Sequence, residues 1–148
     1  MALVLAAVGA GQLGLLRGQP PAGLGVKDGR LAAPSTTPNS VSSQAELWPG
    51  HPQQASARIA PLAGGAATFA RLQGLVSGWP GARIVEAREG YLRAEFTTPL
   101  MKYTDDVEFW LDPSAGVVHV RSASRLGHGD MGANRRRVEA LRARLLAP

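Results

Sequence analysis

The 148-residue sequence contains no cysteine. A disulfide framework, a thiol nucleophile and a thiolate metal site are therefore excluded, and the usual clue to the redox compartment is missing. Lysine is also scarce, since Lys27 and Lys102 are the only lysines among 16 basic residues. Arginine suits planar, bidentate contacts with anions, but the same bias is typical of a GC-rich genome, and we favour the genomic explanation.

The sequence also lacks the short motifs of common catalytic and cofactor sites. Without a His-Glu-x-x-His pair or an acidic calcium loop, His51, His119 and His128 do not predict a metal site. No Gly-x-Ser-x-Gly turn indicates a serine nucleophile. The glycines around His128 lack the lysine of a phosphate-binding loop. We therefore expect neither a metal nor a cofactor.

The net charge of +5 comes entirely from the C-terminal residues. Residues 1–120 carry nine basic and nine acidic residues, whereas residues 121–148 carry seven arginines and two acids. Nucleic-acid binding needs basic residues spread over a large surface, usually with aromatic residues among them, and the aromatics lie elsewhere. Residues 135–137 are consecutive arginines about 100° apart on a helix. We expect them to be solvated and to pair with Glu139, and we expect no nucleic-acid partner.

The first 16 residues predict a membrane-directed segment. Residues 2–16 contain no charge but are fewer than the roughly 20 that span a bilayer. A buried soluble helix is disfavoured because each of Gly9, Gly11 and Gly14 weakens such a helix by about 1 kcal/mol. The first basic residue, Arg17, follows the apolar run, whereas a secretory signal carries its basic residues before it. We expect membrane association or export, with the protein anchored to the membrane or periplasmic.

Residues 17–67 are rich in Pro, Gly, Ser and Gln and show no sustained period, which predicts an extended linker or surface loop. Irregular segments of this length are usually functional or disordered. Residues 38–44, with a Pro-Asn turn and a run of hydroxyls, suit either a free linker or a segment that wraps the domain.

Residues 68–148 predict an α+β domain. A helix starts at Thr68 as N-cap and ends at Pro80-Gly81, and a second starts near Gly132 with Asp130 as N-cap. Between them, alternating patterns predict strands. The predicted strands span 83–89, 91–97, 106–111 and 117–124. We expect a four-stranded antiparallel meander covered on one face by the two helices, with the other face open to solvent or ligand.

The predicted pairing of the last two strands brings polar residues together. An odd register is needed to keep their valines and Phe109 on one face. The polar residues then share the opposite face as cross-strand neighbours. They are Asp106, Glu108, Trp110, His119 and Arg121. One interpretation is an acid–base pocket, and the other is a set of ion pairs worth about 0 to 1 kcal/mol each when exposed. We favour the ion pairs.

A second candidate site lies between the last strand and the last helix. Arginine, hydroxyl and free amide groups at a helix start can hold a carboxylate or phosphate. The candidate residues are Arg121, Ser122, Ser124 and Arg125. Asp130 opposes this interpretation, because a carboxylate that caps the helix occupies the position of an anion. Arg125 would then pair with Asp105, and we favour such an internal brace.

Several separate blocks of the sequence, among them 25–31, 38–44, 105–109 and 118–127, resemble the family catalogued as domain of unknown function 1499. The resemblance covers about residues 25–145. It implies a protein of bacteria or plant plastids, often behind a membrane or export segment, without an established reaction. Members commonly carry two cysteines where this chain has Ser40 and Pro34. A role that needs those thiols is therefore excluded here.

Together these observations predict a non-enzymatic, envelope-associated module. It would bind a small anionic or amphipathic ligand, or a protein partner, on the open sheet face. Arg121 and Arg125 would hold negative charge, and Trp110 and Tyr91 would provide apolar contact. The alternative is a hydrolase or lyase that uses Asp106, Glu108 and His119. In a third interpretation all of these charges are structural.

Overall fold

The computed structural model describes residues 1–148 and contains one antiparallel sheet with strand order β1-β6-β5-β4-β3. The four predicted strands are present in antiparallel order, with ends within two residues of the prediction, but the sheet has six strands and not four. The predicted strands are β3 (Ala82–Arg88), β4 (Tyr91–Thr97), β5 (Thr104–Asp112) and β6 (Val117–Ser124). The chain therefore has an α+β fold.

Two short strands extend the predicted meander. β1 (Ser40–Ser42) and β2 (Leu62–Ala63) both pair antiparallel with β6. Strands of three and two residues are too short to show an alternating pattern in the sequence. Because β1 lies within residues 38–44, this block wraps the domain and is not a free linker. The short helices η1 (Ala45–Leu47) and α2 (Gln54–Ala57) connect β1 to β2.

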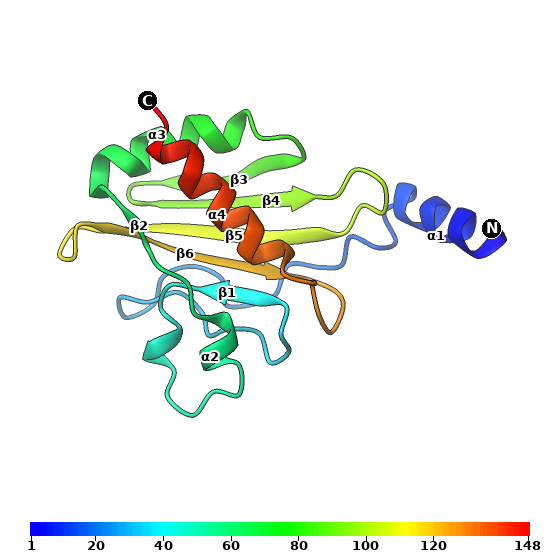
Figure 1. The fold of residues 1–148 in the computed structure, drawn as a ribbon, viewed down its shortest axis with the longest axis horizontal. Coiled ribbons are helices and arrows are strands. Elements are labelled where there is room, and N and C mark those ends of the chain that lie inside the picture. Colours follow the sequence, from blue (N-terminus) through cyan, green and yellow to red (C-terminus); the bar gives the residue numbers. More distant parts are fainter.

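Two helices, α3 (Gly65–Ser77) and α4 (Ala133–Leu146), lie across one face of the sheet, as predicted (Figure 1). Their apolar side chains and those of the sheet form a buried core. The start of α3 differs from the prediction. Gly64, at a φ of 102°, precedes the helix, and the Thr68 hydroxyl donates to the carbonyl of Ala63 at 2.6 Å. Thr68 therefore lies in the first turn and is not the N-cap.

The opposite face of the sheet is covered, so the prediction of an open face was wrong. Asp106, Glu108 and Arg121 are 1%, 0% and 6% exposed. The covering segment is residues 17–36, which we call the N-terminal strap. The sheet holds it by backbone contacts: Glu108 accepts a hydrogen bond from the Gly25 amide at 2.6 Å, and Arg121 donates to the Ala33 carbonyl at 3.0 Å. Buried polar groups need such partners, and the strap supplies one each to Glu108 and Arg121.

The N-terminal helix α1 (Ala2–Gln12) projects from one end of the sheet (Figure 1). Its C-terminal turn touches the β4–β5 loop, where the Gln12 side-chain amide donates to the carbonyl of Leu100 at 3.0 Å. Gly11 packs so closely on the Met101 carbonyl that a Cβ would collide with it. None of the helices combines the length and apolarity needed to cross a bilayer.

The register predicted for the last hairpin is confirmed. Glu108 lies opposite Arg121, and Trp110 lies opposite His119. Phe109 pairs with Val120 on the helix-covered face. The hairpin therefore places the predicted polar residues on the face that the N-terminal strap covers.

Candidate functional site

Arg125 is the centre of an ion cluster on the strap-covered face. It donates to both carboxylate oxygens of Asp106 at 2.8 Å and to Glu95 at 2.6 Å. These hydrogen bonds, first with Asp106, raise the pKa of Arg125 above its ordinary value in spite of burial. The guanidinium thus satisfies two carboxylates of neighbouring strands. The predicted pairing of Arg125 with Asp105 was wrong, because Asp105 binds Arg137 at 2.6 Å on the other face.

The residues of the predicted anion site lie on different faces of the sheet. Arg121 extends under the strap, whereas Ser122 donates to the Asn134 side chain of α4 at 2.6 Å. The Asn134 amide also donates to the Ser124 hydroxyl at 2.9 Å. Both serines therefore fasten α4 to β6. Ser122 faces the helix, away from Arg121, whereas Ser124 also lines a cavity with Arg121 and Arg125.

Asp130 lies two residues before the N-cap of α4, which is Gly132 and not Asp130 as predicted, but its side chain still binds the amides at the helix start. Its carboxylate accepts the backbone amides of Gly132 and Asn134, each at 2.9 Å. Burial alone would raise the pKa of Asp130, but the hydrogen bonds from Asn134 and Gly132 lower it below the ordinary value. The carboxylate stays ionised and fills the position that an anionic ligand would take.

Glu108 and Tyr91 are buried beneath the strap. The Tyr91 hydroxyl donates to Glu108 at 2.8 Å, and burial followed by the Glu108 charge raises the pKa of Tyr91. The second Glu108 oxygen, Oε2, lies 3.9 Å from Arg121 Nη1, and neither atom has a hydrogen-bond partner. Burial lowers the pKa of Arg121, and Glu108 partly opposes this effect. Tyr91 is therefore a polar partner within the fold, whereas we expected an apolar ligand contact.

His119 lies apart from the two carboxylates. It stacks on Trp110, with ring centroids 5.5 Å apart, at the far end of the hairpin. Asp106 and Trp110 are four positions apart along an extended strand, which is about 13 Å. Burial lowers the pKa of His119, and Asp112, 3.5 Å away, opposes that shift in part. The structure therefore does not bring Asp106, Glu108 and His119 together as one acid–base group.

A serine that the sequence did not indicate contacts this histidine. Ser43 Oγ lies 3.1 Å from His119 Nδ1 and accepts the Val120 amide at 2.9 Å. Serine, imidazole and the Asp112 carboxylate form a chain similar to a catalytic triad. None of the five main cavities is lined by any of these residues. The chain of contacts joins the segment after β1 to β6 and to the β5–β6 turn.

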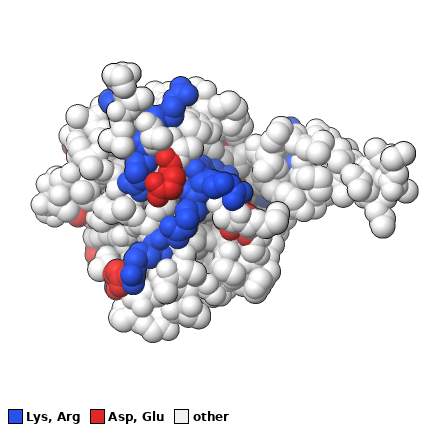
Figure 2. All heavy atoms as spheres, in the orientation of Figure 1, with Lys and Arg blue, Asp and Glu red and all other residues white.

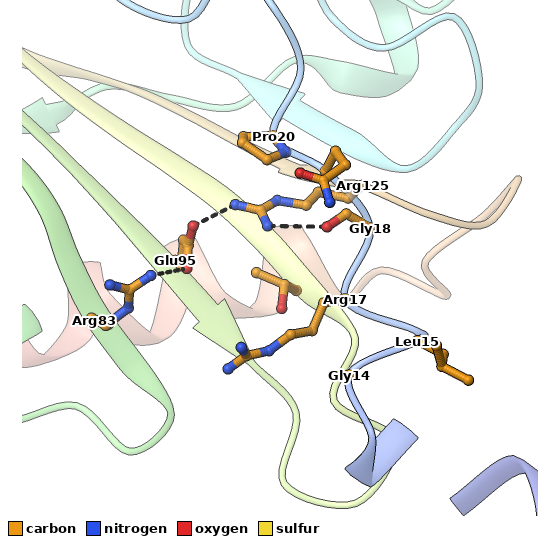
Figure 3. A pocket seen from close by; sticks show the side chains of 10 residues that line it. Gly14, Leu15, Arg17, Gly18, Pro20, Arg83, Glu95 and Arg125 are labelled. Carbon is orange, nitrogen blue, oxygen red and sulfur yellow. Dashed lines mark hydrogen bonds and ion pairs between the residues drawn. The ribbon is translucent and has the colours of Figure 1, made fainter. Parts of the chain in front are cut away.

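The largest of the five main cavities, of about 520 Å³, lies where the segment after α1 meets the strap and the sheet (Figure 3). Three arginines and one carboxylate line it: Arg17, Arg83, Arg125 and Glu95. We call it the arginine cavity. Arg83 donates to Glu95 at 2.8 Å, so Arg83 and Arg125 hold that carboxylate from two sides. Hydrogen bonds from Arg125 and Arg83 lower the pKa of Glu95 although burial would raise it.

Among the three arginines of the arginine cavity, Arg17 is the one whose guanidinium forms no ion pair. It is exposed, and no interaction joins its guanidinium to the other lining residues (Figure 3). A second cavity of about 320 Å³ is lined by Asp106, Arg121, Ser124 and Arg125 together with residues from both ends of the strap. Arg125 lines both cavities. Of the three arginines that line the arginine cavity, the sequence analysis had predicted only Arg125 as a site residue.

The basic residues of α4 form a different surface. Lys and Arg side chains gather on the face that α4 covers, with acidic side chains among them (Figure 2). Several of these guanidinium groups bind carbonyl oxygens: Arg135 donates to Arg58 at 2.8 Å, and Arg142 donates to Pro61 at 2.7 Å. Arg142 also pairs with Glu139. We expected residues 135–137 to be solvated, but Arg135 and Arg137 instead brace the fold.

Comparison with known proteins identifies the family. Residues 30–145 match the family model described as "Protein of unknown function (DUF1499)". The chain belongs to this family. No curated protein matches the sequence. Arg83 and Arg125 lie within the DUF1499 region, and Arg17 precedes it.

One feature of this DUF1499 chain concerns the positions where we expected other members to carry cysteine. Ser40 is buried, and its hydroxyl oxygen accepts the Ser35 amide at 2.9 Å. Pro34, the second such position, is also buried and directly precedes Ser35. The serine hydroxyl therefore holds this turn by a hydrogen bond.

Proposed function

We propose that this DUF1499 protein is an envelope-associated binding module that holds a small anionic group in the arginine cavity. The supporting observation is the charge of the lining, three arginines against the single carboxylate of Glu95. A second observation is that Arg17 has no partner there (Figure 3). Guanidinium groups bind phosphate and carboxylate by paired hydrogen bonds. The ligand class is therefore an anion with two or more acceptor oxygens.

The three arginines would have different tasks in such binding. Arg125 is committed to Asp106 and Glu95, so it contributes mainly fixed positive charge. Arg83 is 71% exposed and bonds Glu95 through one nitrogen, which leaves other donors free. Arg17 supplies a whole guanidinium from the opposite wall. An anion would lie between Arg17 and Arg83.

The proposed position in the cell envelope depends on α1. Its apolar side chains Leu3, Val4 and Leu5 are 86%, 65% and 67% exposed. An apolar helix surrounded by water is unfavourable by about 25 cal/mol per Å² of apolar surface. Insertion into lipid removes that cost, and the cavity lies at the base of this helix. The acid–base alternative has no comparable support, because its three side chains lie apart and bind protein groups.

Titration with inorganic phosphate tests the proposal. We expect millimolar phosphate to shift the NMR signals of residues that line the arginine cavity. The Arg17→Gln variant should bind at least about tenfold more weakly, because a charged hydrogen bond contributes about 1.5 to 3 kcal/mol. The matched control is Arg144→Gln, which removes an exposed arginine near the end of α4. Absence of phosphate binding, or equal binding by the two variants, would overturn the proposal.

A further inference from the structure

Exposed large apolar side chains gather at one end of the molecule. Twelve such side chains are exposed in the whole chain, and ten belong to three neighbouring segments. The ten are Met1, Leu3, Val4, Leu5, Leu13, Leu15, Leu100, Tyr103, Leu126 and Met131. They lie in or next to α1, in the β4–β5 loop and in the β6–α4 loop. The β3–β4 and β5–β6 turns, at the other end of the strands, contribute none.

The three segments are in contact. Gln12 of α1 donates to the carbonyl of Leu100 in the β4–β5 loop. At the start of the strap, six residues after α1 ends, a Cβ on Gly18 would lie 3.0 Å from the Leu126 side chain of the β6–α4 loop. The β4–β5 and β6–α4 loops leave the sheet at the end from which α1 projects (Figure 1). The exposed apolar side chains therefore belong to one surface.

Positive charge accompanies this apolar surface. Arg17 follows α1 and Lys102 lies in the β4–β5 loop, and neither takes part in any ion pair of the chain. The nearby carboxylates Glu95, Asp106 and Asp130 are already bound to Arg125 or to the start of α4. Free cations beside exposed apolar residues complement an anionic lipid surface.

The pattern of α1 favours lipid over a protein partner. Leu3, Val4 and Leu5 are consecutive and therefore point in directions about 100° apart. A partner helix would need one apolar stripe, whereas a helix that is apolar on all sides is surrounded by apolar material. Its 11 residues rise about 16 Å, which is enough to enter the hydrocarbon of the nearer leaflet.

We infer that α1, the β4–β5 loop and the β6–α4 loop form a membrane-docking surface, and that the arginine cavity takes the phosphate of an anionic lipid headgroup. The docking surface rests on the exposed apolar residues. The headgroup assignment rests on the proposed function, because it names the source of the anion bound in the same cavity. In this arrangement the membrane is contacted by α1 and also by two loops of the folded domain.

Vesicle binding tests the docking surface. A double variant, Leu100→Ser with Tyr103→Ser, leaves α1 intact and changes two exposed side chains. The control, Leu47→Ser with Leu146→Ser, changes the two exposed leucines that lie elsewhere. With vesicles of equal parts phosphatidylcholine and phosphatidylglycerol, the first pair should reduce the partition coefficient at least about tenfold, since two apolar side chains are no longer removed from water on binding. Equal partitioning of both pairs would overturn the docking surface.

A second comparison tests the headgroup assignment. Arg17→Gln and Lys102→Gln remove the same charge from the same end, but only Arg17 lines the cavity. Arg17→Gln should lose more of the preference for phosphatidylglycerol over pure phosphatidylcholine vesicles than Lys102→Gln. If both variants lose that preference equally, general electrostatic attraction explains it and the assignment fails. If Arg17→Gln loses inorganic phosphate binding but keeps the full lipid preference, the assignment also fails while the proposed function stands.

Discussion

At the scale of single residues, the most consequential side chain is Arg125. Asp106 is 1% exposed, and its two carboxylate oxygens depend on this one guanidinium at hydrogen-bond distance. Arg93 lies 3.6 Å from the same carboxylate and adds charge without a hydrogen bond. A buried carboxylate that loses its partner is much more costly than an exposed one. We therefore expect Arg125 to matter for the stability of the fold, whether or not the cavity binds a ligand.

We predict that Arg125→Gln lowers the free energy of unfolding by about 3 to 5 kcal/mol, because it leaves Asp106 buried without its main partner. The control, Arg83→Gln, removes another arginine bound to Glu95, but one that is largely exposed. Its effect should stay below about 1 kcal/mol. Urea unfolding followed by circular dichroism compares the two. Similar losses in both variants would show that burial of the Asp106–Arg125 pair is not decisive.

His119 gives a prediction about pH. Burial holds its pKa below the ordinary value of 6.5, and Asp112 opposes that shift. The unfolded chain therefore binds a proton more readily than the folded protein. The stability that His119 contributes is complete above about pH 6.5 and is lost as the pH falls through the folded pKa.

The role of Asp112 can be measured through the same histidine. Asp112→Asn removes a negative charge 3.5 Å from Nε2 but keeps an oxygen for the turn amides of Ser114 and Ala115. We expect the pKa of His119, followed by NMR titration, to fall further in this variant. An increase would show that Asp112 does not stabilise the imidazolium.

At the scale of elements, the strands and the main helices could be predicted from side-chain periodicity. Alternation in β5 and β6 fixed their register, because a slip by one residue would have buried Arg121 in the apolar core. The N-terminal strap could not be predicted in the same way. The strap is held through the backbone amide of Gly25 and the backbone carbonyls of Gly18 and Ala33. Every residue type has a backbone carbonyl, and every residue type except proline has a backbone amide hydrogen. Backbone contacts of this kind leave little trace in a sequence.

The contact of α1 with the β4–β5 loop requires a residue without a Cβ at position 11. We predict that Gly11→Ala separates α1 from the loop, since the added Cβ would collide with the Met101 carbonyl. Gly9→Ala is the matched control, because its Cβ would meet open space and should favour the helix by about 1 kcal/mol. NMR contacts between Gln12 and Leu100 should vanish only in the first variant. Their persistence would show that the helix shifts to accommodate the methyl.

At the scale of the whole molecule, the candidate site was only partly predictable. Arg125 could be predicted from its place between the last strand and the last helix. Arg17 and Arg83 could not, because they are 108 and 42 residues away in sequence and neither lies in a motif. They line the same cavity as Arg125 only because the strap crosses the sheet where β3 starts and β6 ends. The apolar N-terminal segment was recognisable because a run of side chains without charge is a local signal.

The position of β6 in the sheet also constrains how the protein can be made. β1 and β2, from the first half of the chain, both pair with β6, which is synthesised almost last. On the ribosome, the strap and β1 must therefore wait for about 80 further residues before their partners exist. Such long-range pairing slows folding and prolongs the exposure of incomplete intermediates. During that interval α1 is already outside the ribosome. The membrane docking that we propose for α1 would therefore let a bilayer bind the nascent protein before its sheet closes.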